Sequence, residues 1–154
     1  MARDLFVKKS ILVNRPRKEV FEYLKYSRNQ DEFSVWNMKD PNRKVEVKGI
    51  DGTIGHIYSW DSATDKNVGA GSQEITKIVA EERIEYKLRF ERPMKNVADS
   101  KFVLREISNN QTEVIWDFTG PTKFPMSLFK SIFEKMLGKD LSKSLDNLKA
   151  RLES

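Results

Sequence analysis

Apolar and polar residues follow two different spacings along this chain. From Glu82 to Arg92 they alternate one by one, so that apolar residues share one side of a strand: Ile84, Tyr86, Leu88 and Phe90. Such alternation is typical of an antiparallel sheet with one face buried and the other in water. After residue 125 the apolar residues recur every three or four positions, which places them on one face of an α-helix. The pattern therefore predicts a sheet followed by one long helix.

The predicted helix runs from Pro125 to Leu152. Proline suits its first turn, where the missing N–H has no helical partner. About 27 residues at a rise of about 1.5 Å give a rod of about 40 Å. Its apolar stripe consists of Met126, Phe129, Ile132, Phe133, Met136, Leu137, Leu141, Leu145, Leu148 and Leu152. A stripe of this length requires a broad apolar partner, and the strands before it supply one.

Seven segments have strand character: 5–13, 43–50, 54–61, 68–79, 82–92, 97–107 and 112–119. Asp51-Gly52 predicts a tight hairpin turn between the second and third strands. After the first strand, Pro16 opens a short helix that reaches Leu24, and a second short helix is expected through Phe33. The order predicts an α+β fold in which the long helix lies across the apolar face of an antiparallel sheet.

Composition narrows the class of protein. A chain of 154 residues predicts a single domain over 1–154, and its 38% hydrophobic and 33% charged residues are typical of a soluble globular protein. There is no apolar run long enough to span a membrane. The absence of cysteine rules out disulfides, thiolate metal sites and thiol nucleophiles, and fits a cytoplasmic location. The net charge of +5 comes from basic residues mixed with acids, so nucleic-acid binding is not expected.

Motifs for cofactor or metal chemistry are weak. Gly69-Ala-Gly71 resembles half of a dinucleotide fingerprint, but the third glycine and the crossover helix are missing, so a β-bulge is the better interpretation. His56 is the only histidine, and no cysteine accompanies it, so neither a zinc site nor any other cofactor is expected. Glu106 is in phase with Phe102, which makes it the best candidate for an inward carboxylate with a raised pKa. His56 and Glu106 are the only catalytic candidates, and both are weak.

Large aromatic and methionine side chains are the most informative feature. They fall on the apolar faces of the strands, on the helix stripe, and in the segment 33–41, which is expected to be irregular. They either pack as a solid core or line a cavity that segment 33–38 covers. Under the second interpretation the ligand-binding residues are Phe33, Trp36, Met38, Trp60, Tyr86, Phe90, Phe102, Trp116, Phe118, Phe129, Phe133 and Met136.

The layout resembles the START-like (SRPBCC, helix-grip) superfamily, and in particular its bacterial polyketide cyclase/dehydrase-like group. The resemblance covers nearly the whole chain and rests on segments 16–24, 36–41, 55–60, 69–76, 82–84, 90–93, 112–116, 138–141 and 145–149. It implies a curved seven-stranded antiparallel sheet wrapped around the long C-terminal helix, with two short helices after the first strand and an apolar pocket between helix and sheet. It supplies no cyclase catalytic residues.

These observations favour a soluble binding protein for a hydrophobic or amphipathic small molecule, lipid or polyketide-like, held between the helix and the sheet. Two alternatives stay open. One is a cyclase- or hydrolase-type enzyme that acts on such a ligand, although a binding role is favoured over catalysis. The other is an interaction domain like the activators of the Hsp90 chaperone, which share the fold. We expect a monomer or a weak homodimer.

Overall fold

Seven antiparallel strands form one curved sheet in the computed structural model, which describes residues 3–122 and 126–154. The strands are neighbours in the order β1-β7-β6-β5-β4-β3-β2, so the chain forms a meander from β2 to β7 and β1 lies beside β7. Their bounds are β1 Arg3–Val13, β2 Lys44–Lys48, β3 Ile57–Asp61, β4 Ala70–Val79, β5 Arg83–Arg92, β6 Asn96–Ser108 and β7 Gln111–Thr122.

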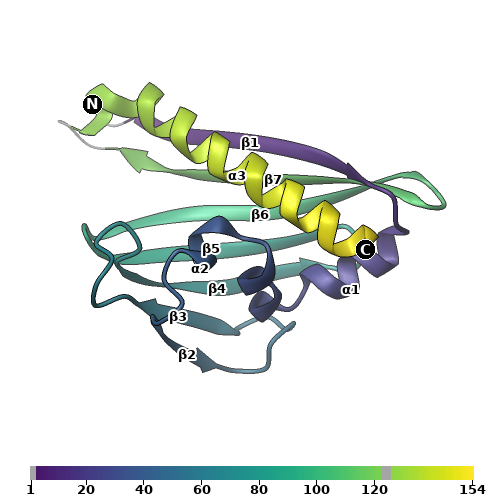
Figure 1. Cartoon of the computed structure of the whole chain (residues 1–154), viewed down its shortest axis with the longest axis horizontal. Coiled ribbons are helices and arrows are strands. Elements are labelled where there is room, and N and C mark those ends of the chain that lie inside the picture. Colours follow the sequence, from purple (N-terminus) through teal and green to yellow (C-terminus); the bar gives the residue numbers. More distant parts are fainter. Residues whose placement is uncertain (1–2, 123–125) are drawn as a thin grey trace.

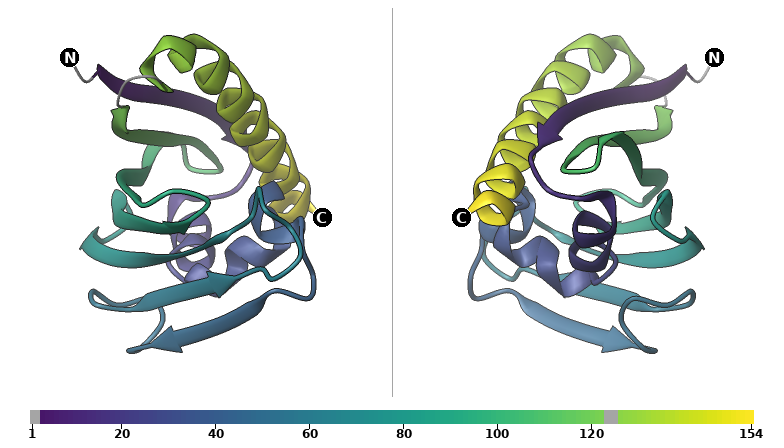
Figure 2. Two further views of the ribbon diagram at one scale, coloured as in Figure 1. Left: turned by 90° about the vertical axis from the view of Figure 1, so that its left-hand side faces the viewer. Right: turned by 90° about the vertical axis from the view of Figure 1, so that its right-hand side faces the viewer.

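Helical segments follow β1 and β7. They are α1 Arg17–Leu24, η1 Ser27–Glu32, α2 Val35–Met38, η2 Met126–Phe129 and α3 Lys130–Glu153. The sheet curls around α3 (Figures 1 and 2), which confirms the predicted α+β helix-grip fold. The expected helix start at Pro125 lies outside the described residues. The second short helix is a 3-10 helix, and the segment expected to be irregular contains the one-turn helix α2. No described helix is both long and apolar enough to cross a membrane.

The connection between β2 and β3 is longer than the tight turn that the sequence predicts. It occupies residues 49–56, because Asp51 makes contacts away from the hairpin. Its two carboxylate oxygens accept the backbone N–H groups of Ser27 at 2.7 Å and Arg28 at 3.1 Å. These N–H groups belong to the first turn of η1 and have no partner within the helix. The Asp-Gly pair therefore caps a helix and also forms a β-turn, in which the Thr53 N–H donates to the Ile50 carbonyl at 3.2 Å, but this turn does not join the two strands directly.

The sheet bends at β4, where glycine was expected to mark a bulge. The register between β4 and β5 shifts between Ala70 and Gly71, which confirms that interpretation. A Cβ atom on Gly71 would lie 2.6 Å from the carbonyl oxygen of Arg89 and 2.8 Å from the Trp60 ring. Only glycine allows this approach without displacing its neighbours. Glycine thus brings the Trp60 indole onto the concave face of the sheet.

The long helix lies along the edge strand β1 and is fixed there at two points. The Glu134 carboxylate accepts the backbone N–H of Phe6 at 2.8 Å, and the Glu153 carboxylate accepts that of Asn14 at 2.7 Å. In between, a Cβ atom on Gly138 would lie 3.0 Å from the Lys9 side chain, so helix and strand are in close contact. Carboxylates from α3 therefore satisfy one N–H group of this edge strand and one of the residue that directly follows it.

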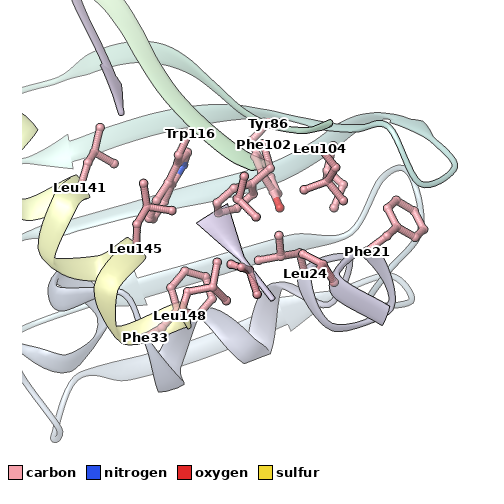
Figure 3. Close-up of a cluster of buried hydrophobic side chains, with 14 of the residues drawn as sticks. Phe21, Leu24, Phe33, Tyr86, Phe102, Leu104, Trp116, Leu141, Leu145 and Leu148 are labelled. Atoms are coloured by element: carbon pink, nitrogen blue, oxygen red, sulfur yellow. The ribbon is translucent and has the colours of Figure 1, made fainter. Parts of the chain in front are cut away.

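The apolar stripe of α3 is buried in its second half only. Leu141, Leu145 and Leu148 are fully buried, whereas Ile132 and Met136 are more than half exposed. The first half lies near β1, the last strand at that edge of the sheet, so its outer side has no apolar surface to cover it (Figure 2). The second half packs on a core of aromatic and aliphatic side chains from α1, Phe33 and the sheet (Figure 3).

Candidate functional site

A cavity of about 250 Å³ lies between the concave face of the sheet and residues 27–38, which we call the η1–α2 segment. Five strands, from β3 to β7, supply one wall, and the only α3 residue in the lining is Leu137. The lining residues are Ser27, Gln30, Ser34, Trp36, Asn37, Lys39, Arg43, Tyr58, Trp60, Asn67, Val68, Gln73, Leu88, Phe90, Ser100, Trp116, Phe118 and Leu137. The space is therefore formed mainly by the sheet and the η1–α2 segment.

Two groups of aromatic rings form the apolar walls. Trp60 packs edge-on against Phe90, with ring centroids 6.0 Å apart, and Phe90 lies 6.4 Å from Phe118. Trp36 packs edge-on against Trp116 at 5.9 Å. These tilted and edge-on contacts are the arrangements that aromatic pairs favour. Both walls present ring surface to a ligand without a rearrangement of the core.

The structure brings five of the twelve predicted ligand-binding residues to the cavity: Trp36, Trp60, Phe90, Trp116 and Phe118. Three others, Phe33, Tyr86 and Phe102, are buried in the core outside the lining. The Phe102 ring stacks on Trp116 at 4.6 Å, and the rings of Phe33 and Tyr86 pack against Phe102. The last four lie away from the lining: Met38, Phe129 and Met136, which are about half exposed, and Phe133, which packs on the core. Periodicity identifies the inward face but not how closely that face is packed.

Neither weak catalytic candidate reaches the cavity. Glu106 is in phase with the inward residues of β6 but exposed, because it follows the last buried position, Leu104, and the register with β7 shifts after it. The expected inward carboxylate is therefore not present at Glu106. His56 is buried and outside the lining, with Nδ1 3.6 Å from the Asp51 carboxylate. Its position matches a structural role in the β2–β3 connection.

A charged network on one side of the cavity was not foreseen from the sequence. One Asp31 carboxylate oxygen accepts hydrogen bonds from Arg43 Nη2 at 2.8 Å, the Tyr58 hydroxyl at 2.8 Å and Asn37 Nδ2 at 2.9 Å. Arg43 also donates to the Tyr58 oxygen at 2.7 Å. Burial and the hydrogen bond to Asp31 raise the pKa of Tyr58 to about 12. The alternation of β3 points to Tyr58, but no local pattern links it to the two distant ionised residues.

Three polar side chains of α3 hold the η1–α2 segment in place. Asp140, Ser144 and Asn147 follow one face of the helix at helical spacing. Each makes one hydrogen bond to this segment: Asp140 with the Trp36 indole N–H at 3.1 Å, Ser144 with the Val35 N–H at 3.0 Å, and Asn147 with the Phe33 carbonyl at 3.1 Å. The cavity wall that was expected to be irregular is thus anchored to the helix.

The fold and the lined cavity define a helix-grip protein with an internal pocket. The chain belongs to the family described as polyketide cyclase/dehydrase and lipid transport, whose pattern matches residues 6–153. The membership agrees with the resemblance noted in the sequence. No curated protein matches the chain.

Several solved structures share the fold at low sequence identity. Norcoclaurine synthase from Thalictrum flavum, in complex with dopamine and hydroxybenzaldehyde, is 9% identical with a TM-score of 0.73, over 98% of this chain and 87% of that one. Protein CV1439 from Chromobacterium violaceum is 15% identical with a TM-score of 0.66, over 97% and 98%. DynU16, a putative protein of the dynemicin biosynthetic locus, is 15% identical with a TM-score of 0.67, over 99% of this chain and 48% of that one. At these identities the likeness concerns the fold alone.

Proposed function

We propose that this protein binds a hydrophobic or amphipathic small molecule in the cavity between the sheet, the η1–α2 segment and α3. One observation carries the proposal: six aromatic side chains, Tyr58 among them, line a space that the fold leaves unfilled. Protein interiors are normally packed without such voids, so a cavity of this size with an aromatic lining favours a ligand. The description of the family, with its polyketide and lipid chemistry, supports the same class of ligand.

The size of the cavity favours a small ligand. Its volume of about 250 Å³ is near the lower end of the range for small-molecule sites, about 300–1,000 Å³. A ligand of one to three rings suits this space better than a long acyl chain. Burial of about 200 Å² of apolar ligand surface would contribute about 5 kcal/mol before the cost of association, at about 25 cal/mol per Å². We therefore expect a purely apolar probe to bind weakly, with a dissociation constant of about 0.2 mM or higher.

Binding has more support than catalysis in this cavity. The two residues that the sequence suggested for acid–base chemistry, Glu106 and His56, are outside its lining. Asp31, which is bonded to the lining residues Asn37, Arg43 and Tyr58, already accepts three hydrogen bonds. Its carboxylate is thus committed to structural contacts.

Native mass spectrometry of the protein purified from its own host tests the proposal directly, because a retained ligand adds its mass. As a second measurement, an apolar naphthalene compound is titrated while tryptophan emission is followed. The indoles of Trp36, Trp60 and Trp116 line the cavity, so binding there should quench emission to saturation. The absence of both added mass and saturable quenching would contradict a ligand-binding role and favour an interaction domain.

A further inference from the structure

One end of the cavity lining is polar but carries no net charge. Ser27, Gln30 and Ser34, from η1 and the residue that precedes α2, are exposed by 1%, 4% and 1%. Within the described part of the chain, the two serine hydroxyls have no hydrogen-bond partner, and the Gln30 amide nitrogen has none of normal geometry, although it faces the buried Tyr86 hydroxyl. A buried polar group without a partner costs about 1–3 kcal/mol, so native structures rarely leave several together. Their position at the lining indicates that their partners come from the cavity.

A fourth neutral polar group lies on the sheet. Gln73 is on the concave side of β4, paired across the strands with Tyr58 and Leu88. The next residue of that row is Ala98, so Gln73 is an amide in an otherwise largely apolar surface. Its side chain lines the cavity and makes no hydrogen bond to any residue that the structure describes. An amide can donate to a carbonyl or accept from a hydroxyl, which makes Gln73 suited to a neutral oxygen.

The ionised groups of the lining are already engaged or lie in solvent. Arg43 is committed to Asp31 and Tyr58, as described above. Lys39, the other cation of the lining, is exposed. Among the described residues of the lining, a carboxylate that entered the polar end would find four neutral groups and no free cation. Burial of an unpaired charge is far more costly than that of a hydrogen-bonded neutral group.

We propose that the cavity selects ligands that carry an uncharged oxygen, such as a ketone, phenol or alcohol, on an apolar ring body. Gln30 and Gln73 bind that oxygen, and the aromatic walls bind the rings. Carboxylates such as fatty acids and aromatic acids are disfavoured. This inference rests on the proposed binding function and specifies the class of ligand.

Three naphthalene compounds of similar size test it by isothermal titration calorimetry at neutral pH: methyl naphthyl ketone, isopropylnaphthalene and naphthoate. We expect the ketone to bind most tightly and naphthoate at least about 10-fold more weakly than the ketone. In Gln73→Leu and in Gln30→Leu, the ratio of the dissociation constant of isopropylnaphthalene to that of the ketone should fall about fivefold, the worth of one hydrogen bond. Gln111→Leu is the matched control, because Gln111 bonds Asn14 outside the cavity lining.

Isopropylnaphthalene also reports on folding, since both glutamine variants should still bind it. If none of the three compounds binds the unmodified protein, the proposed function fails and this inference falls with it. Equal binding of ketone and hydrocarbon, with no change in the variants, would leave the binding function standing and overturn the selectivity for neutral oxygen. Tightest binding of naphthoate would also overturn it and would assign the polar end to an anion.

Discussion

The indole nitrogen of Trp36 donates a hydrogen bond to the Asp140 carboxylate of α3 across 3.1 Å. The ring of Trp36 forms one wall of the cavity, while Asp140 belongs to the helix around which the sheet curls. The helix therefore has two roles. Its buried leucines complete the core, and its polar face fixes the position of the η1–α2 segment.

Asp140→Ala removes the acceptor of this bond and should loosen the η1–α2 segment. A partly buried hydrogen bond to a carboxylate predicts a loss of about 1–2 kcal/mol in the free energy of unfolding. Amide hydrogen exchange should become faster around Val35 while the centre of the sheet stays protected. Asp140→Asn retains an oxygen acceptor and should lose less, and Asp146→Ala, at an exposed position of the same helix, should change stability by less than about 0.5 kcal/mol. Equal effects of Asp140→Ala and Asp146→Ala would show that the contact adds nothing.

The two halves of α3 should respond differently to truncation of their apolar side chains. Leu145→Ala removes a side chain that is 1% exposed and should cost about 2–5 kcal/mol of unfolding free energy. Ile132→Ala, in the exposed half, should cost less than about 1 kcal/mol in chemical denaturation. Similar losses at the two positions would mean that the first half of the helix is covered in solution.

Acid should weaken the attachment of α3 to β1. The N–H group of Phe6 lowers the pKa of Glu134, and that of Asn14 lowers the pKa of Glu153; in both cases this backbone bond is the largest cause and the neighbouring lysine adds to it. A carboxylate whose pKa is lower in the folded state stabilises the protein above its unfolded pKa of 4.5, and this stabilisation is lost as the pH falls through the folded value. Unfolding free energy measured from neutral pH downward should therefore fall.

The double variant Glu134→Gln and Glu153→Gln should reduce this dependence on acid, because glutamine still accepts the N–H but does not titrate. The exposed Glu106→Gln serves as the control and should leave the pH profile unchanged. If the double variant lost stability with acid as steeply as the unmodified protein, other carboxylates would be responsible.

The fold could be predicted almost completely because it follows from local patterns. Alternation gave the seven strands, and the spacing of residues 125–152 gave the long helix. Asp51-Gly52 does form a β-turn, but the prediction that it joins the two strands directly was wrong. The sequence could not show that Asp51 also binds the N–H group of Ser27, which lies far away in the chain. The prediction that the whole apolar stripe of the helix is buried was right only for its second half. The spacing of apolar residues in the helix does not show where the sheet ends.

The cavity could be predicted only in part. Trp116 and Phe102 have the same character in the sequence and face the same side, yet the first lines the cavity and the second lies in the packed core. The difference depends on the distance between the η1–α2 segment and the sheet. The hydrogen bonds from this segment to α3 determine that distance. In the sequence, Asp31 and Arg43 look like ordinary charged surface residues. Their pairing beside Tyr58 depends on the three-dimensional fold.

A pair of neighbouring substitutions on α3 tests whether a ligand binds in the cavity. Leu137 lines it, whereas the adjacent Met136 is 59% exposed and faces away from it. Leu137→Trp should fill the space and abolish binding of a naphthalene compound. Overpacking of a solid core costs about 1–3 kcal/mol, but an indole that enters a void should change the unfolding free energy by less than about 1 kcal/mol.

Met136→Trp adds the same indole on the outer side of the helix and should leave both binding and stability unchanged. A large loss of stability in Leu137→Trp, together with no compound bound by the unmodified protein, would mean that the interior is solid in solution. The exposed apolar half of α3 would then become the better place to look for a function.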